Sequence, residues 1–320
     1  QAIESFTTFA DTVRDDARQP EARFRLGQMF QARGEYLIAA DYYTGLIDEQ
    51  QDSLRPGVGL WADLSYVPLA QCYIQDVDDG NDDDALRLLG SAIDGARGGP
   101  DRPEFRQAVL ELGNLAFRGG RYAEAIERYE EALARESDLG DEPLVRFRLA
   151  DSYRLLAEEI DRRLAEPMSD RDAGLLADER SGHLRRAIEL FTGVRDELSG
   201  RDPRTLSQVE KTYLRNAFFY LGDCAFDLRS FEEAIEYYGM ARSSYPGEPA
   251  VLVALIQIVN AYIELGDTRS ARTANERAKA FYQSLPPEVW DDPNLPLGRR
   301  EWERWLNSNA KLYEEVAQGG

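Results

Sequence analysis

Residues 207–246 contain two helix signals separated by a short turn, and this pattern constrains the fold more than any other feature of the sequence. Ser207 and Ser230 are each followed three residues later by a glutamate. This is the spacing of a capping box, which marks the start of a helix. Pro246 ends the second helix, because proline cannot continue one. The stretch therefore predicts a helical hairpin.

Apolar side chains recur at helical spacing along both predicted helices, so each helix has one apolar face. Two small residues interrupt these faces, Gly222 in the first helix and Ala234 in the second. We expect the helices to approach each other closely at these positions. The large side chains expected to fill the space around this contact are Phe218, Leu221, Phe231 and Tyr238.

Similar landmarks recur along the chain, and such self-similarity is the signature of a repeat architecture. The predicted units are residues 20–50, 59–96, 106–137, 143–198, 207–246 and 249–283. A single hairpin cannot shield its apolar face, whereas stacked hairpins bury it between neighbours. The sequence therefore predicts an all-α solenoid over residues 20–283.

The best-formed unit resembles the tetratricopeptide repeat, a helix–turn–helix of about 34 residues. The residues that carry the resemblance are Phe218, Leu221, Gly222, Ala225, Phe231, Ala234, Tyr238, Ala241 and Pro246. The resemblance implies about six repeats that wind into a right-handed αα-superhelix with a concave face. It also implies that the first helix of each repeat lines this face.

The segments outside the repeats are predicted to cap the solenoid. Residues 1–18 are expected to form a helix that either caps the first repeat or completes an upstream one. Residues 285–298 hold four of the 14 prolines, so we expect an extended strap with Trp290 as its anchor. Residues 299–317 are predicted to form a C-terminal capping helix.

Two repeats carry extra residues. The acidic run at residues 76–84 has the carboxylates that calcium prefers, but its spacing does not fit an EF-hand, so we expect a solvated turn. The insertion at residues 157–182 predicts an overlong first helix that Pro167 ends, with Ser169 capping the next helix. Insertions in solenoids lie on one rim and often make contacts, and an inert spacer is the alternative.

The composition narrows the choice of partner. The formal charge is −21, which disfavours nucleic acid and anionic membranes and favours a basic peptide or protein. The alternative is that the charge only keeps the protein in solution. No run of about 18 apolar residues is present, so no membrane-spanning helix is predicted.

The sequence offers few residues for chemistry. His183 is the one histidine, and a single histidine does not supply a zinc cluster; we expect a surface residue or a mild helix cap. Cys72 and Cys224 lie within repeats, which predicts buried free thiols. Phosphate-binding glycine loops and nucleophile motifs are absent. We therefore predict a protein that is not an enzyme and needs no cofactor or metal.

The resemblance implies that two residues of each first helix line the concave surface. They lie two positions before and two positions after the leucine of the family's Leu-Gly pair, or the residue that occupies its place. The first row is apolar and comprises Phe24, Val67, Leu110, Phe147, Phe219 and Ile256. The second row is polar and comprises Gln28, Gln71, Asn114, Asp151, Asp223 and Asn260. Amides both donate and accept hydrogen bonds, which suits the backbone of an extended peptide.

Further side chains one turn along the first helices are predicted to add pockets to this groove. They are Phe117, Arg118, Arg154 and Phe226. One subclass of the family binds the carboxylate end of a tail through lysines in these rows. Here the lysine positions hold Phe, Leu or Val, which argues against such a clamp. The alternative for the whole groove is that the apolar row belongs to the core and the polar row meets only water.

Three functions remain open from the sequence. The leading hypothesis is a scaffold that binds a peptide or protein segment in the concave groove. The second is a structural assembly or self-association module. It is supported by the apolar run at residues 251–259, the tryptophan-rich C-terminus and a segment expected upstream of Gln1. The third is an accessory domain of an enzyme. The ending Tyr245-Pro246 resembles bacterial cell-envelope members of the family, so the compartment stays open between cytoplasm and periplasm.

Overall fold

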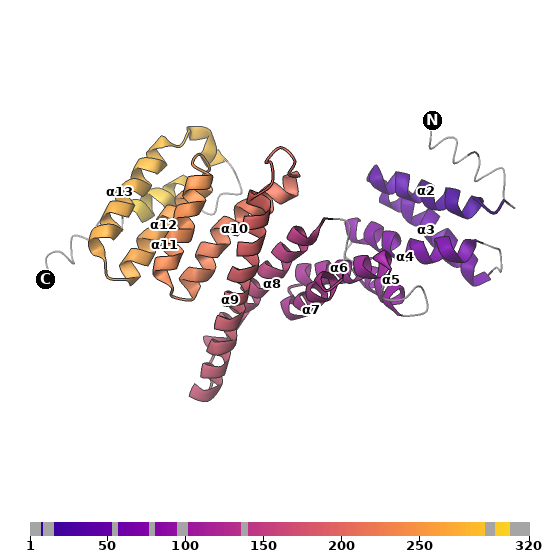
Figure 1. Ribbon diagram of the computed structural model, residues 1–320, viewed down its shortest axis with the longest axis horizontal. Helices are drawn as coiled ribbons and strands as arrows, with labels where there is room; N and C mark the ends of the chain where they lie inside the picture. The colour runs from indigo at the N-terminus through magenta and orange to yellow at the C-terminus, as the bar shows by residue number, and fades with distance from the viewer. Residues whose placement is uncertain are drawn as a thin grey trace. The chain divides into compact units, whose positions relative to one another are not determined.

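The computed structural model describes Thr8 and residues 16–52, 57–76, 81–94, 102–135, 140–291 and 298–307. Within these ranges the ordered elements are helices, and no strand occurs (Figure 1). The all-α prediction is thus confirmed. The helix predicted at residues 1–18 lies largely outside the described residues, as do residues 308–317 of the predicted capping helix.

The chain forms two compact units, Gln1–Gly140 and Asp141–Gly320. The first contains α2 (Gln19–Ala32), α3 (Tyr36–Asp52), α4 (Val58–Gln75), α5 (Asp82–Ile93), α6 (Pro103–Arg118) and α7 (Tyr122–Leu133). Each helix packs against the next along the chain, from α2 through α7. The repeats predicted from 20, 59 and 106 correspond to the hairpins α2–α3, α4–α5 and α6–α7.

The second unit is built in the same way. It contains α8 (Glu142–Leu164), α9 (Asp170–Ser199), α10 (Gln208–Asp227), α11 (Phe231–Ser244), α12 (Ala250–Glu264), α13 (Thr268–Ser284) and the 3-10 helix η2 (Pro287–Asp291). Residues 299–307 are also helical. The hairpins are α8–α9, α10–α11 and α12–α13.

The first helices form the inner layer of each unit. In the first unit α2 contacts α4 and α4 contacts α6; in the second, α8 contacts α10 and α10 contacts α12. Among the described residues, no two successive second helices, such as α3 and α5, pack together as extensively. The first helices therefore lie closer together than the second helices, which is how hairpins stack when the first helices are on the concave side.

Three hairpins are closed by the same device, a glycine of the first helix beneath a tyrosine ring of the second. The pairs are Gly27 with Tyr43, Gly113 with Tyr129 and Gly222 with Tyr238. A Cβ atom on any of these glycines would come within 2.4–2.9 Å of the ring. The tyrosines are buried almost completely. The close approach predicted at Gly222 is confirmed, and its partner is the Tyr238 ring.

The first of the two predicted capping boxes is confirmed. The Ser207 hydroxyl accepts a hydrogen bond from the Glu210 backbone N–H at 3.2 Å, and the Glu210 carboxylate accepts one from the Ser207 backbone N–H at 2.7 Å. The second box was wrong, because the Ser230 side chain does not cap α11. Arg229 has a φ of 60°, and the Ser230 N–H bonds back to Ala225 in a tight turn. This turn removes Ser230 from the extended geometry that a cap needs.

The long insertion extends both helices of its hairpin. α8 ends before Pro167 and α9 starts after Ser169, whose hydroxyl accepts from the Asp172 N–H at 3.2 Å, as predicted. The far end of the α8–α9 hairpin projects beyond the neighbouring helices of its unit (Figure 1). Leu175 lies on this projection with 61% of its surface exposed.

The acidic run is partly helical, which corrects the prediction of one turn over residues 76–84. Residues 77–80 lie outside the described part of the chain. Asp82, Asp83 and Asp84 form the first turn of α5. Carboxylates are favourable there because the N-terminal end of a helix carries partial positive charge.

The C-terminal end caps the last repeat. Trp302 and Leu306 are 3% exposed and pack on a cluster that includes Leu252 and Leu255 of α12. The predicted strap is not extended throughout, because residues 287–291 form η2. Its predicted anchor is in place, with the Trp290 ring 4.9 Å from the Tyr282 ring. The apolar run of α12 is thus covered by the chain itself.

Candidate functional site

A series of hydrogen bonds crosses the first helices of the first unit. The Gln31 Nε2 of α2 donates to the Gln71 Oε1 of α4 at 3.2 Å, and the Gln71 Nε2 donates to the Glu111 Oε1 of α6 at 2.8 Å. The Asn114 Nδ2 donates to the other Glu111 oxygen at 3.0 Å. We call Gln31, Gln71, Glu111 and Asn114 the polar ladder.

Buried tyrosines fix both ends of the polar ladder. The Tyr43 hydroxyl donates to the Gln31 Oε1, and the Tyr129 hydroxyl donates to the Asn114 Oδ1, both at 3.0 Å. These are the rings that lie on Gly27 and Gly113. The packing device that closes each hairpin therefore also orients the polar side chains of the inner layer.

The polar ladder contains two predicted residues, Gln71 and Asn114, and two that the sequence analysis missed. Gln31 lies three residues after Gln28, and Glu111 lies three residues before Asn114. Residues three apart share a helix face, so this spacing was a usable signal. Gln28 itself is exposed and accepts a hydrogen bond from Arg25 rather than joining the ladder.

The other predicted residues of the first unit are divided between core and surface. Phe24, 6% exposed, packs on the rings of Tyr43 and Trp61, and Val67 is 1% exposed. Phe24 was therefore wrong as a groove residue, because its ring fills the space between α2, α3 and α4. The remaining residues are the half-buried Leu110, the half-buried Phe117 and the exposed Arg118.

In the second unit the inner layer carries an ion pair on an aromatic ring. The Asp151 carboxylate lies 2.7 Å from the Arg154 guanidinium, which also sits 4.5 Å from the centre of the Tyr220 ring. Burial raises the pKa of Asp151, and Arg154 opposes this rise. Tyr220 was not predicted as part of the site. It comes one residue after the predicted Phe219, on an adjoining face of α10.

Asp223 occupies the position in α10 that Asn114 occupies in α6. Its Oδ1 accepts a hydrogen bond from the Tyr238 hydroxyl at 2.6 Å, just as Asn114 accepts one from Tyr129. Burial raises the pKa of the Asp223 carboxyl above its ordinary value. The repeat thus keeps the tyrosine bond whether the acceptor is an amide or a carboxylate.

The remaining predicted residues of the second unit do not form one surface. Phe147 is 4% exposed and stacks on Tyr213 at 4.1 Å, so it was wrong as a groove residue for the same reason as Phe24. Ile256, the predicted apolar residue of α12, is also buried. The half-buried ones are Phe219, Phe226, which packs edge-on to Phe231, and Asn260, which donates to Gln257.

We expect Asp223→Asn to stabilise the protein at pH 8 by about 1 kcal/mol, because it removes a buried charge while keeping the tyrosine bond. The raised pKa means that the folded state binds a proton more tightly than the unfolded state. The native carboxyl therefore recovers stability as the pH falls through its folded-state pKa toward about 3.9. The gain from Asp223→Asn should shrink at pH 5.

Calorimetry of both proteins at pH 5 and pH 8 measures this difference. Asp196→Asn serves as the control, because the Asp196 side chain is 62% exposed. A gain for Asp223→Asn that is the same at both pH values would show that burial of the charge is not its cause.

The described residues contain no cluster of three or more potential metal ligands. His183 lies well inside α9 and is half-buried, with its ring centre 5.5 Å from that of Tyr153. The expectation of a surface residue or helix cap was therefore wrong, because the lengthened α8 covers this part of α9. Both cysteines are buried free thiols, as predicted. Across the described part of the chain, none of the helices combines the length and apolar character needed to cross a bilayer.

Comparison with protein families identifies these hairpins. The model of the tetratricopeptide repeat matches residues 76–140, 110–157 and 173–249. The chain belongs to the tetratricopeptide repeat family. Helices α5–α7, α10 and α11 lie within the matches, which also cover parts of α8 and α9. The family supports a general role as a protein-interaction scaffold. No curated protein matches the sequence.

The chain is also similar to solved structures. One is a signal transduction ATPase from Pyrococcus horikoshii with a tetratricopeptide repeat sensor. It has a TM-score of 0.56 and 15% identity over 97% of this chain and 41% of that chain. Another is MamA of AMB-1, with a TM-score of 0.44 and 18% identity over 74% of this chain and 98% of that chain.

Proposed function

We propose that this tetratricopeptide repeat protein is an interaction scaffold that holds an extended peptide segment of another protein against the first helices of its first unit. The observation that carries the proposal is the polar ladder, which crosses α2, α4 and α6. Oriented polar groups on successive helices present donors and acceptors along a line. An extended backbone needs partners arranged in this way.

The ladder keeps hydrogen-bonding capacity for a partner. Gln31 and Gln71 each use one of their two side-chain N–H groups within the ladder. The second N–H group of each amide can donate to a peptide carbonyl. The exposed Gln28 extends the same surface toward the start of α2. The Glu111 carboxylate adds negative charge, which favours a peptide that carries lysine or arginine.

No specific observation favours the alternative of an assembly module. The apolar run at residues 251–259 supported that alternative in the sequence. In the structure one side of this run packs on the C-terminal helix, around Trp302 and Leu306. Its other side packs on α10, α11 and α13.

The test uses a library of random peptides displayed on phage, selected against the full chain. For enriched peptides we expect Gln71→Ala to raise the dissociation constant about 3–10-fold, the effect of losing one hydrogen bond. Glu127→Ala is the matched control, because Glu127 is exposed on α7, a second helix of the same unit. Isothermal titration of the three proteins supplies the constants.

Two results would contradict the proposal. One is a peptide whose affinity falls with Glu127→Ala and not with Gln71→Ala. The other is a failure of the library to yield any peptide that binds the full chain.

A further inference from the structure

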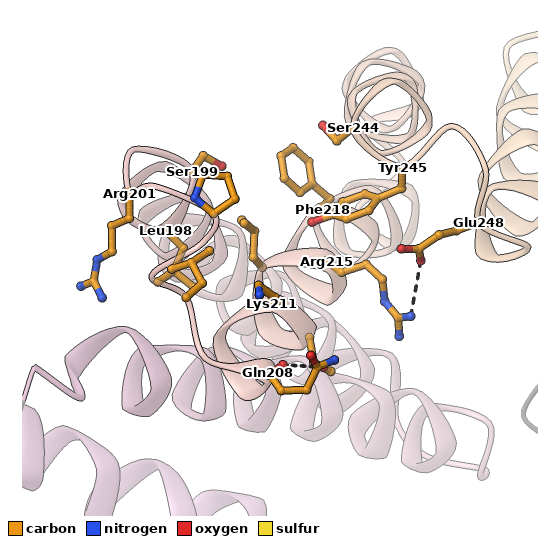
Figure 2. A pocket seen from close by; sticks show the side chains of 14 residues that line it. Leu198, Ser199, Arg201, Gln208, Lys211, Arg215, Phe218, Ser244, Tyr245 and Glu248 are labelled. Carbon is orange, nitrogen blue, oxygen red and sulfur yellow. Dashed lines mark hydrogen bonds and ion pairs between the residues drawn. The ribbon is translucent and has the colours of Figure 1, made fainter.

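A pocket of about 580 Å³ opens in the second unit, and none of the predicted groove residues lines it. It forms where the C-terminal ends of α9 and α11 meet the N-terminal half of α10. Figure 2 shows Lys211 between Leu198 on one side and Phe218 and Tyr245 on the other. The pocket is therefore a feature separate from the polar ladder.

The walls of the pocket are apolar and well supported. The Phe218 and Tyr245 rings pack edge to face, with their centres 5.7 Å apart. Leu198 and Leu206 are 0% and 6% exposed, so their positions are fixed by the core behind them. Aromatic and leucine walls of this kind take up an apolar group of similar size.

The charge of the lining is opposite to that of the chain. Arg201, Lys211 and Arg215 line the pocket, and Glu248 is the single carboxylate among the lining residues. The whole chain carries −21. Arg201 is held by two glutamates outside the lining, at 2.6 and 3.0 Å. Arg215 donates to the Asn216 Oδ1 at 3.2 and 3.3 Å and lies 3.4 Å from the Glu248 carboxylate, the contact that the dashed line in Figure 2 marks.

Lys211 differs from the other two cations of the pocket lining. Its ammonium makes no hydrogen bond or ion pair with any residue that the structure describes. Lys279, in contrast, pairs with Glu276 at 3.1 Å. An ammonium group has three N–H donors, and here they adjoin the apolar walls. The position thus suits a ligand with an acceptor at one end and an apolar body at the other.

We propose that this pocket binds a carboxylate attached to an aromatic or branched aliphatic body. Lys211 and Arg215 hold the carboxylate, and the body packs against Phe218 and Tyr245. A free small carboxylic acid and the last residue of a peptide share this chemistry. The site does not depend on the polar ladder, so either proposal can fail without the other.

The probes are N-acetyl-phenylalanine, its primary amide, and the tripeptide acetyl-Gly-Gly-Phe with a free carboxylate. Binding to the full chain is followed by NMR and titration calorimetry. For the better of the two acids we expect a dissociation constant of about 1 mM, consistent with a ligand of this size. Binding should weaken as the salt concentration rises from about 50 to about 500 mM.

Lys211→Gln should weaken binding of that acid about tenfold, the scale of one charge-assisted hydrogen bond. Lys279→Gln removes the same charge from α13 and should leave the affinity unchanged. Because Lys211 has no partner, its replacement should not alter the melting temperature. A melting temperature that matches the native protein therefore assigns any loss of binding to the pocket.

The outcomes separate the ligand sources. If the free acid binds as well as the tripeptide, the pocket takes a small carboxylic acid. If only the tripeptide binds, it takes a peptide C-terminus. Equal binding of the amide, equal effects of Lys211→Gln and Lys279→Gln, or no binding of either acid at about 10 mM would each overturn the proposal.

Discussion

Gly222→Ala should destabilise the protein by about 1–3 kcal/mol, the range for overpacking a close contact. The added Cβ would lie 2.4 Å from the Tyr238 ring, closer than real Cβ contacts. The ring is 1% exposed, and its hydroxyl is held by Asp223 at 2.6 Å. The ring therefore cannot move aside without breaking this hydrogen bond. Chemical denaturation measures the change in the free energy of unfolding.

Gly239→Ala provides the matched control for this substitution. Gly239 lies inside α11, in the same hairpin, and a Cβ there meets no atom within 4 Å. Alanine should stabilise this helix by about 0.5–1 kcal/mol, because glycine is the poorer helix former. The two substitutions are chemically identical and should have opposite signs. If Gly222→Ala is neutral or stabilising, the glycine–tyrosine contact does not close the hairpin.

Trp302→Ala should cost about 3–5 kcal/mol of local stability, the usual range for removing a buried aromatic side chain. Trp302 is 3% exposed and packs with Leu252 and Leu255 of α12. Neighbouring repeats stabilise one another only through their interfaces, so the loss should concentrate in the last hairpin. Hydrogen exchange should become much faster in α12 and α13 and change little in α2–α7.

Trp290→Ala is the control for the capping helix. Trp290 belongs to η2, is only partly buried and packs against Tyr282 at 4.9 Å. Its removal should therefore accelerate exchange in α12 far less than Trp302→Ala does. Comparable effects of the two substitutions would show that the helix at residues 299–307 is not the cap of the last repeat.

Local signals in the sequence predicted most of the fold. Three of these signals depend on neighbours along the chain or on one facing helix. They are the Ser207 capping box, the small residue at Gly222 and the end of the second helix shortly before Pro246. Ser230 shows the limit of such signals. The spacing to its glutamate is correct, but the turn at Arg229 sets a backbone geometry that excludes the cap.

The candidate site was less predictable, because it depends on reach between helices. The link from Gln31 through Gln71 to Glu111 joins residues 40 positions apart at each step. The three-residue spacing shows which polar residues share a helix face, but it does not show which of them will extend to the next helix. The same holds for Phe24 and Phe147. The resemblance predicted that both line the concave surface, whereas the packing of neighbouring hairpins buries them. The division into two units was not predicted either.

The most direct test of the central claim is a photo-crosslinking measurement on the full chain with a peptide selected from the library. A photoreactive amino acid is placed at Gln28, beside the polar ladder, or at Glu127 on α7. If the first helices hold the peptide, mass spectrometry should find it attached at position 28 and not at position 127. Attachment at position 127 with none at position 28 would contradict the account.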